Sequence, residues 1–218
     1  SPDGNPLAYV ATTASQGLTP LEVQAGKTAP QNVCVVLDGV EQKHFATIVQ
    51  PLIFSQDGKS VAYFAGIDQL NGGTRAVIDG QEGHAYVAGQ QLVMSDDGRH
   101  SAYVATKLFP EKVTEGGITR DVSYRYDVVV ENGKEDPADD SVPSQIRILR
   151  MSRNGQRVAY VEAIDPAGPS GHIVIVDNGK PSHPYKACDT LLISPDGKTV
   201  LYIAIGAQGG FIVVNGQE

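Results

Sequence analysis

The sequence of 218 residues contains no tryptophan and only two cysteines. It has no apolar run that approaches the ~20 residues needed to span a bilayer. Basic residues are also scarce, since 17 Lys and Arg stand against 25 Asp and Glu, for a formal net charge of −8. A negative field repels phosphate backbones, so nucleic acid is not expected as a partner. Hydrophobic residues make up 41% of the chain, which indicates a globular protein rather than a disordered one.

Catalytic signatures are missing as well. Neither a His-Glu-x-x-His nor a Cys-x-x-Cys spacing occurs, which argues against a metal hydrolase. No Gly-x-Ser-x-Gly elbow occurs, and Gly168-Pro169-Ser170-Gly171 has the wrong spacing for one. No Gly-rich phosphate loop precedes a helix, because no segment predicts a convincing helix. We therefore expect neither an enzyme nor a cofactor.

The two cysteines, Cys34 and Cys188, are far apart in the sequence. Cys34 lies in the apolar run Val33-Cys34-Val35-Val36, so we expect a buried free thiol that acts as a small hydrophobe. A disulfide between the two is the alternative, although nothing in the sequence places their Cα atoms within the required ~7 Å. Metal binding by two isolated cysteines is not expected.

The sequence does contain one short sequence motif that occurs five times. A tetrapeptide of the form Ser-x-Asp-Gly, with Asn for Asp in one copy, is followed by an Ala-Tyr or Leu-Tyr pair. Self-similarity at a period of tens of residues is the signature of a repeat architecture. The five copies begin at Ser1, Ser55, Ser95, Ser152 and Ser194.

The second copy shows the repeat unit most clearly. Two β-rich runs, residues 51–54 and 60–65, are joined by the Asp57-Gly58 turn and predict a hairpin. Gly58 can adopt a positive φ, and Asp57 can bond nearby backbone. A third run at residues 75–78 and a second Asp-Gly turn lead to a fourth short strand. An antiparallel four-stranded unit of about 40 residues, repeated, predicts a β-propeller blade.

We interpret the repeated features as scaffold, because they recur in every unit whereas an active site would occur once. The first strand of each unit is apolar and should be innermost, covered on both faces by neighbouring blades. The repeated tyrosine should fill the core between blades, with its hydroxyl bonded to the backbone.

The pattern from Ser194-Pro195-Asp196-Gly197-Lys198 to Leu201-Tyr202 resembles the WD40-like propeller repeat. That repeat occurs in TolB, in tricorn protease and in the propellers of prolyl-oligopeptidase-type peptidases. The resemblance covers nearly the whole chain and implies an all-β propeller of an uncharacterised bacterial branch. Two related patterns are absent: the Trp-Asp pair of WD40 repeats, and the Ser-x-Asp-x-Gly box of sialidases.

The predicted fold is therefore an all-β propeller of five four-stranded units in a single domain, residues 1–218. Eighteen strands are expected, because the first unit lacks its inner strand and the fifth lacks its outer strand. Flanking residues of a longer chain, an imperfect closure, or pairing of the open edges with another chain would each account for this. The units span roughly residues 1–49, 50–89, 90–144, 145–188 and 189–218.

Variation in length is concentrated in the connections between the second and third strands, and two of these, Thr12–Gln31 and Thr106–Ser123, are long. Insertions on one face of a repeat protein often mark its binding face. Apolar side chains there would anchor a partner, or would fold back over the propeller as a small satellite cluster. The candidate binding residues are Leu18, Leu21, Leu108, Phe109, Ile118 and Arg120.

An acidic cluster follows the third unit's second turn. Hard cations take carboxylate oxygens, so the cluster is a candidate Ca²⁺ site. Its spacing matches no calcium loop, and a solvated turn is the alternative interpretation. The residues concerned are Glu135, Asp136, Asp139 and Asp140.

These observations favour a non-catalytic scaffold or binding module for a protein or a carbohydrate. One alternative is a structural subunit of an extracellular homo-oligomer or fibre, assembled through exposed β-edges. Another is the propeller domain of a larger hydrolase. The resemblance implies an extracellular or periplasmic location, with no membrane span.

Overall fold

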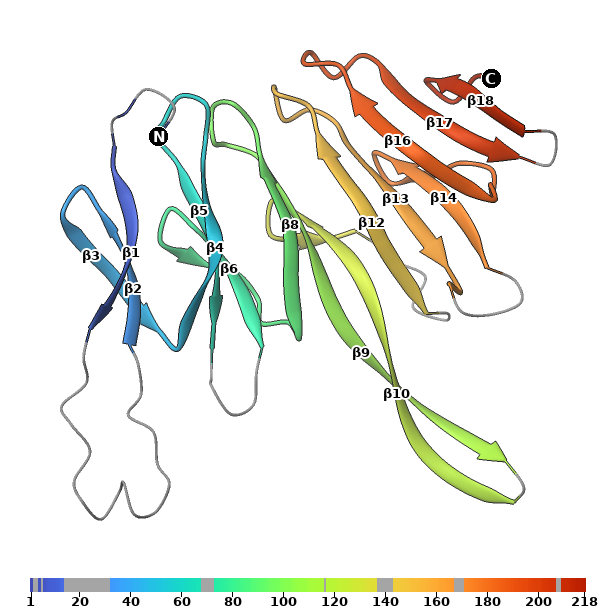
Figure 1. Cartoon of the computed structure of the whole chain (residues 1–218), viewed down its shortest axis with the longest axis horizontal. Coiled ribbons are helices and arrows are strands. Elements are labelled where there is room, and N and C mark those ends of the chain that lie inside the picture. The colour runs from blue at the N-terminus through green and yellow to red at the C-terminus, as the bar shows by residue number, and fades with distance from the viewer. Residues whose placement is uncertain are drawn as a thin grey trace. The chain divides into compact units, whose positions relative to one another are not determined.

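The computed structural model describes residues 1, 4, 6–13, 32–67, 73–115, 117–136, 143–166, 171–206 and 209–218. Within these residues the chain is all β, with eighteen strands and no helix (Figure 1). A search of the same residues for a helix able to cross a membrane found none. The strands form five antiparallel sheets.

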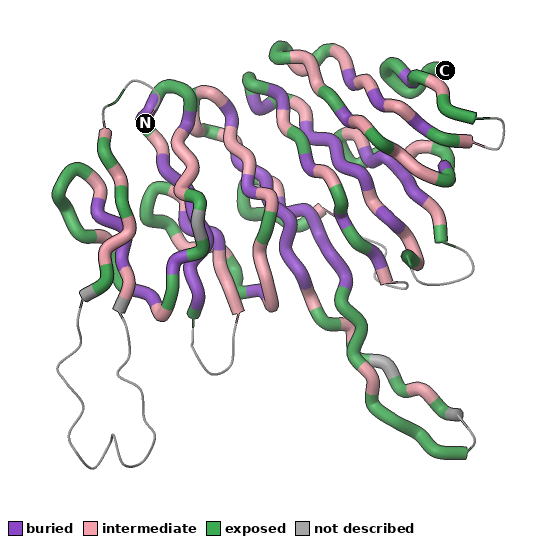
Figure 2. The backbone as a smooth tube through the Cα atoms, in the orientation of Figure 1, coloured by how far each residue is buried: buried purple, intermediate pink, exposed green. Residues whose placement is uncertain are grey.

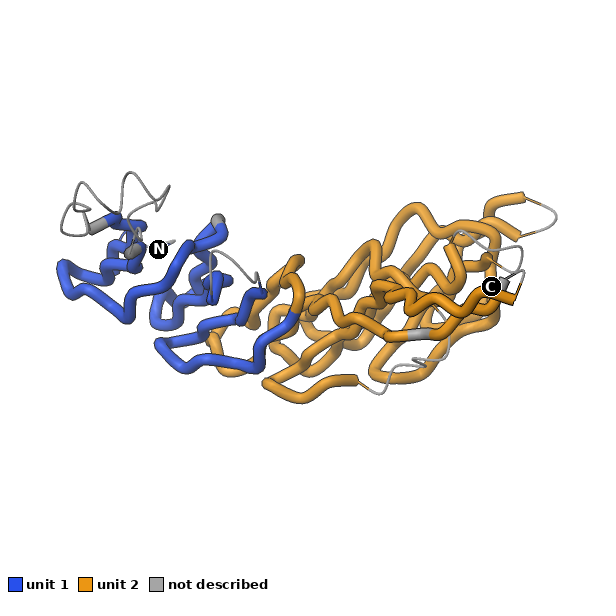
Figure 3. Tube along the Cα trace, turned by 90° about the horizontal axis from the view of Figure 1, so that it is seen from below, with its two compact units in different colours: residues 1–86 blue, residues 87–218 orange. Residues whose placement is uncertain are grey.

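The described residues divide into two compact units, Ser1–Tyr86 and Val87–Glu218 (Figure 3). The first unit holds two sheets, with strand orders β1-β2-β3 and β4-β5-β6-β7. Its strands are β1 (Ala8–Thr13), β2 (Asn32–Leu37), β3 (Val40–Phe45), β4 (Thr47–Phe54), β5 (Val61–Gly66), β6 (Thr74–Ile78) and β7 (Gln81–Glu82).

The second unit holds three sheets, with orders β8-β9-β10-β11, β12-β13-β14-β15 and β16-β17-β18. The strands of its first two sheets are β8 (Ala88–Met94), β9 (Ser101–Glu115), β10 (Ile118–Glu131), β11 (Lys134–Glu135), β12 (Ser144–Met151), β13 (Val158–Ile164), β14 (His172–Asp177) and β15 (Lys180–Pro181). Its last sheet contains β16 (Ala187–Ile193), β17 (Val200–Gly206) and β18 (Gly209–Val214).

Each sheet is an antiparallel meander in which strands adjacent in sequence are adjacent in space. Three sheets have four strands, and the first and last have three, which is the predicted arrangement. The all-β fold of repeated propeller-type blades is thus confirmed. The single domain of residues 1–218 stays a prediction.

The Ser-x-Asp-Gly turns are held by their own side chains. Ser55 Oγ donates to Asp57 Oδ1 at 2.7 Å, and the N–H of Lys59 donates to the same oxygen at 3.1 Å. Gly58 takes a φ of +72°. These contacts recur at the turns that begin with Ser95, Ser152 and Ser194, so the predicted structural role of the turn is confirmed.

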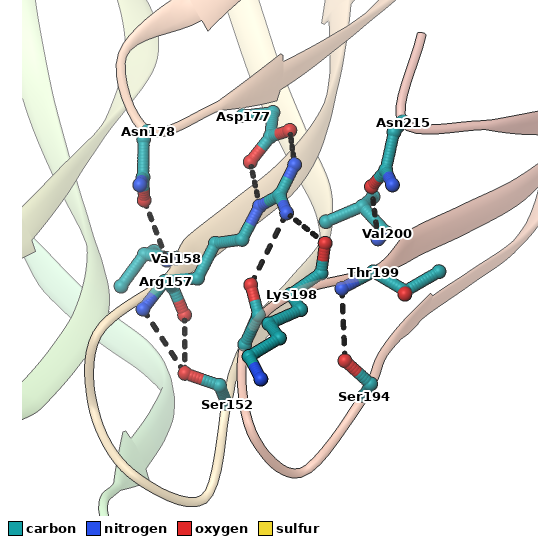
Figure 4. Close-up of polar contacts among 11 residues, drawn as sticks. Ser152, Arg157, Val158, Asp177, Asn178, Ser194, Lys198, Thr199, Val200 and Asn215 are labelled. Carbon is teal, nitrogen blue, oxygen red and sulfur yellow. Dashed lines mark hydrogen bonds and ion pairs between the residues drawn. The ribbon is translucent and has the colours of Figure 1, made fainter. Parts of the chain in front are cut away.

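The second turn of each unit contains a clamp that the sequence did not predict. The Asp or Asn of this turn has a positive φ, and its Oδ1 accepts a hydrogen bond from a backbone N–H at the start of the unit's second strand or one residue before it. In the fourth sheet the N–H of Val158 donates to Asn178 Oδ1 at 3.0 Å, and in the fifth Val200 donates to Asn215 at 2.9 Å (Figure 4). The same contact joins Leu7 to Asp38, Val61 to Asp79 and Ser101 to Asn132.

Arg157 ties the fourth sheet to the fifth. Its Nε donates to Asp177 Oδ1 at 2.7 Å, and its Nη2 forms a second bond to the other carboxylate oxygen. Its Nη1 reaches the backbone carbonyls of Gly197 and Lys198 at 3.1 and 3.0 Å (Figure 4). The guanidinium thus cross-links one sheet to the turn of the next.

Burial is greatest on the second strand of each complete unit, not on the first. Every residue of β5 is buried, whereas β8, a first strand, has only one buried residue, Leu92 (Figure 2). The prediction that a first strand is covered on both faces was therefore wrong for β8, whereas the innermost position of the first strands stays a prediction. A first strand has one sheet neighbour, whereas the second strand is flanked on both sides and covered on both faces.

The repeated tyrosine is buried in four of five copies: Tyr63, Tyr103, Tyr160 and Tyr202. Tyr63 packs with Val35 and Phe45 of the preceding sheet, which explains why Tyr9, in the first sheet, is 49% exposed. The prediction that the tyrosine hydroxyl bonds to the backbone was wrong for two of these residues. Tyr160 donates to Asp136 Oδ2 at 2.9 Å, and the Tyr202 hydroxyl lies 3.4 Å from that of Tyr185.

Candidate binding site

The segment predicted as the long loop Thr106–Ser123 is instead a β-ribbon. β9 and β10 continue past the third sheet as a two-stranded antiparallel extension. Their pairing has no bulge from the Lys107–Tyr126 pair at the base to the Glu115–Ile118 pair at the far end. Figure 1 shows it projecting away from β8 and β12. We call residues 107–115 and 117–126 the ribbon.

One face of the ribbon is polar. Lys112 lies opposite Asp121, with Nζ 4.0 Å from Oδ1, and Thr114 lies opposite Thr119, with the two hydroxyls 3.0 Å apart. Pairs on the same face of an antiparallel ladder stabilise it by about 0.2–1 kcal/mol each. These two contacts join the strands on this face, which also carries the exposed Leu108.

The other face is apolar. Phe109 lies opposite Tyr124. Ile118 is 59% exposed and Tyr124 is 37% exposed. Arg120 stands opposite Val113 and is also exposed. We call the set Phe109, Val113, Ile118, Arg120, Val122 and Tyr124 the apolar face; the register also places Glu111 opposite Val122 and Glu115 opposite Ile118.

The base of the ribbon is fixed to the body of the second unit. The buried carboxylate of Asp127 accepts from the Thr106 hydroxyl at 2.7 Å and from the Ile146 N–H at 3.1 Å. Lys107 Nζ donates to Glu135 at 2.8 Å and lies 5.9 Å from the centre of the Tyr126 ring. The hydrogen bond to Glu135 raises the pKa of Lys107. The ribbon therefore leaves the sheet from a rigid base.

Three predicted binding residues, Phe109, Ile118 and Arg120, come together on the apolar face, whereas Leu108 lies on the opposite face and is exposed. Leu18 and Leu21 lie outside the described residues. Sequence reasoning missed Val122 and Tyr124. The alternation of apolar and polar residues from Ile118 to Tyr126 is the period-two signal of a strand and would have revealed both.

The described part of the acidic cluster is engaged within the protein. Glu135 pairs with Lys107, and Asp136 accepts from the Tyr160 hydroxyl. Burial, with the charge of Asp136 nearby, raises the pKa of Tyr160, which keeps this phenol protonated as a donor. Asp139 and Asp140 lie outside the described residues, so the Ca²⁺ site stays a prediction.

Both cysteines are free thiols in the structure, with Cys34 fully buried and Cys188 partly buried. Burial raises the pKa of the Cys34 thiol, and the Glu41 carboxylate raises it further. Burial likewise raises the pKa of Cys188. Neither environment is that of a low-pKa nucleophile.

The fifth sheet exposes a second apolar surface, formed by Leu192, Ile205, Ile212 and Val214. When the repeats are aligned on the repeated tyrosine, Ile205 corresponds to Ala163 of the fourth sheet. When they are aligned on the second turn, Ile212 corresponds to Ile175. Those two residues are buried in the core shared with Leu191 and Tyr202 of the fifth sheet. The exposed surface of the fifth sheet therefore corresponds to the surface with which the fourth sheet packs on its neighbour. It is a feature of the repeat and not unique to the fifth sheet.

A pocket of about 370 Å³ lies between the fourth and fifth sheets. Burial, followed by the hydrogen bond with Tyr185, raises the pKa of Tyr202, so its phenol is neutral. The pocket thus offers hydroxyl, amide and imidazole groups beside two aromatic rings. Its lining includes Lys180, Ser182, His183, Tyr185, Tyr202 and Asn215.

No protein-family model matches the chain. No curated protein matches it either. Among solved structures it is similar to TolB from Acinetobacter baumannii, at 16% identity over 86% of this chain and 46% of that chain, with a TM-score of 0.34. It is also similar to Kuenenia stuttgartiensis hydrazine synthase, at 14% identity over 86% of this chain and 66% of that chain, with a TM-score of 0.43.

A third similar structure is the β-propeller domain of the Trilobed protease from Pyrococcus furiosus. The identity is 10% over 97% of this chain and 92% of that domain, with a TM-score of 0.29. These likenesses concern the fold, and the predicted resemblance to TolB-type propeller proteins is confirmed at that level. The assignment of the repeated units as blades rests on the sheets themselves.

Proposed function

We propose that this chain is a non-catalytic propeller module that binds a protein partner through the apolar face of the β9–β10 ribbon. The observation that carries the proposal is the exposure of Ile118 and Tyr124 on an extension whose base is rigid. An isolated two-stranded ribbon is marginal in water, and burial of its apolar face by a partner would stabilise it.

The composition of the apolar face supports a protein as the partner. Phe109 and Tyr124 supply rigid aromatic area, and Arg120 supplies a charged group beside them. Aromatic residues and Arg are enriched at the centres of protein interfaces and among the residues that dominate their affinity. A nucleic acid would instead require a dense basic surface, against the net charge of −8.

The size of the ribbon indicates what kind of protein would fit. The stretch of β9 from Lys107 to Glu115 gives a length of about 30 Å at ~3.3 Å per residue. With a width of about 10 Å, one face offers about 300 Å², against ~800 Å² per partner in a standard interface. A partner that binds the apolar face alone would therefore form a small interface, of the size typical of weak, transient complexes.

Uniqueness also favours the ribbon over the fifth-sheet surface. Among the described residues, β9 and β10 are the only paired strands longer than eight residues, whereas the fifth-sheet surface repeats the contact made by the fourth sheet. Features that occur once are where a repeat scaffold carries its specific function.

A second candidate ligand is a carbohydrate in the pocket beside Tyr185 and Tyr202. Aromatic rings next to hydroxyl and amide groups suit the apolar and polar faces of a sugar ring. Titration calorimetry against a panel of oligosaccharides, with Tyr185→Ala as the comparison, would test it. Sugar binding unaffected by Tyr185→Ala would exclude this pocket as the site.

The remaining alternatives have distinct tests. Polymerisation through β-edges requires assembly that depends on concentration, which sedimentation measures. A hydrolase propeller requires a catalytic domain in the natural polypeptide, which the denatured mass of the natural protein reveals. An extracellular or periplasmic location belongs to the proposal and is tested by fractionation of the source cells.

The main experiment compares two ribbon variants as baits in extracts of the source cells. Val122→Ser with Tyr124→Ser changes the apolar face, and Lys112→Ser with Thr119→Ala changes the polar face. A protein retained by the wild type and the polar-face variant, but lost with the apolar-face variant, is then purified and titrated directly. Equal binding of that purified protein to both variants would overturn the proposal.

A further inference from the structure

The first sheet brings together three side chains with metal-ligating atoms, Cys34, Glu41 and His44. Cys34 on β2 is paired directly with His44 on β3, and Glu41 is paired with Val36. β3 has one more residue than β2 between these pairs, which is a β-bulge. In a regular strand, residues three apart point to opposite faces, and the bulge is what places Glu41 and His44 on the same face.

The three ligand atoms are close to one another. One ligand atom of each residue lies within 4.8 Å of the other two, and Glu41 Oε2 is 3.3 Å from His44 Nε2. Bonds of about 2.0–2.1 Å to nitrogen and oxygen in a tetrahedral Zn²⁺ site imply a nitrogen–oxygen separation of about 3.3 Å. The Glu41–His44 pair therefore already has the spacing of two zinc ligands.

The burial of the three residues also suits a metal. Cys34 is fully buried, whereas the side chains of His44 and Glu41 are 35% and 58% exposed. A cation would enter past the exposed carboxylate and imidazole and reach the sulfur beneath them. Thiolate, imidazole and carboxylate together are the donors that Zn²⁺ takes, and three such ligands leave a fourth position for water.

Comparison among the repeats shows that this arrangement is not part of the scaffold. At the position of Cys34 the second sheet has Arg75, and the corresponding glutamate, Glu82, is bound by Arg75 Nη1 at 2.6 Å. The position of His44 is Ala85 there. In the described part of the chain, no other group of three or more His, Cys, Asp or Glu side chains has this proximity.

We propose that Cys34, Glu41 and His44 form a Zn²⁺ site with three protein ligands and a fourth position occupied by water. The sulfur anchors the ion from the buried side, and the carboxylate and imidazole complete the site from the solvent side. The site lies in the first unit and is independent of the proposed function of the ribbon.

The experiment uses the full chain with Co²⁺ as a spectroscopic probe and Zn²⁺ as the competitor. A thiolate bound to Co²⁺ gives a charge-transfer band in the near ultraviolet, and tetrahedral coordination gives intense visible bands. We expect both bands to appear at one Co²⁺ per chain and to disappear when Zn²⁺ is added. Native mass spectrometry should show one zinc per chain.

The variants are chosen from the repeats so that the fold tolerates them. Val occupies the position of Cys34 in the third and fourth sheets, and Ala occupies that of His44 in the second. Cys34→Val should abolish the charge-transfer band, and His44→Ala should weaken Co²⁺ binding at least tenfold. Cys188→Ala, which removes the other thiol, should leave the spectrum unchanged. Absence of a thiolate band in the wild type, or its loss in Cys188→Ala alone, would overturn the proposal.

Discussion

Thr106 and Asp127 face each other across β9 and β10 at the level where the ribbon leaves the third sheet, and the Thr106 hydroxyl donates to the Asp127 carboxylate at 2.7 Å. The other carboxylate oxygen accepts from the backbone N–H of Ile146 on β12. One buried side chain thus joins both strands of the ribbon to the neighbouring sheet. This carboxylate therefore links the base of the ribbon to β12.

Asp127→Ala should therefore destabilise the protein by about 2–3 kcal/mol, because a buried hydroxyl and a buried N–H lose their acceptor. Urea unfolding at neutral pH measures the change. Asp121→Ala is the control, since Asp121 is 86% exposed and lies 4.0 Å from Lys112, so its removal should cost less than about 0.5 kcal/mol. Equal effects of the two substitutions would refute the anchoring role.

Arg157→Ala should cost about 2 kcal/mol, because Asp177 loses a bidentate partner and two turn carbonyls lose a donor. The pair is mostly buried, with side chains 18% and 26% exposed. Arg99→Ala provides the comparison, since Arg99 is 83% exposed and lies 3.8 Å from Asp97. Thermal and urea unfolding should separate the two variants clearly, and an Arg157→Ala protein as stable as Arg99→Ala would contradict the cross-link.

Asn178 tests the turn clamp. Asn178→Ala removes the hydrogen bond to the Val158 N–H and forces Ala into a φ of +47°, so we expect a loss of about 1–3 kcal/mol. Asn178→Asp should be nearly neutral, because Asp38 and Asp79 make the same contact in the first two sheets. Chemical denaturation distinguishes them. If Asp and Ala proved equally damaging, the side-chain oxygen would not be the stabilising group.

Glu82 should make the stability of the first unit depend on pH. Hydrogen bonds from Lys43 and Arg75 hold the pKa of Glu82 below its usual range, although its burial opposes this. The stabilisation is therefore complete above the ordinary glutamate pKa and is lost as the pH falls through the lowered folded-state value. Glu82→Gln should reduce the loss of melting temperature between about pH 6 and about pH 2. An identical acid dependence in both proteins would show that Glu82 does not contribute.

Most of the scaffold was predictable because its determinants are local. The Ser55–Gly58 turn and its copies contain the residues that close them, and apolar runs on either side define the strands. The greater burial of the second strands was not predictable in this way, because it depends on which sheets lie on either side.

The candidate sites were only partly predictable. Phe109, Ile118 and Arg120 were found from the length of their segment, but interpreting it as a loop hid the pairing that brings Val122 and Tyr124 to the same face. The Cys34, Glu41 and His44 cluster was not found at all. It depends on a bulge in β3 that changes which side chains share a face, and such a bulge has no clear signal in one sequence.

The most direct test of the central claim is amide hydrogen exchange of the intact protein with and without the purified partner. Our account predicts new protection of the ribbon amides between Lys107 and Tyr126 when the partner is present, with little change in the fifth sheet. Protection confined to β16–β18 or to the pocket beside Tyr185, with unchanged exchange in the ribbon, would contradict it.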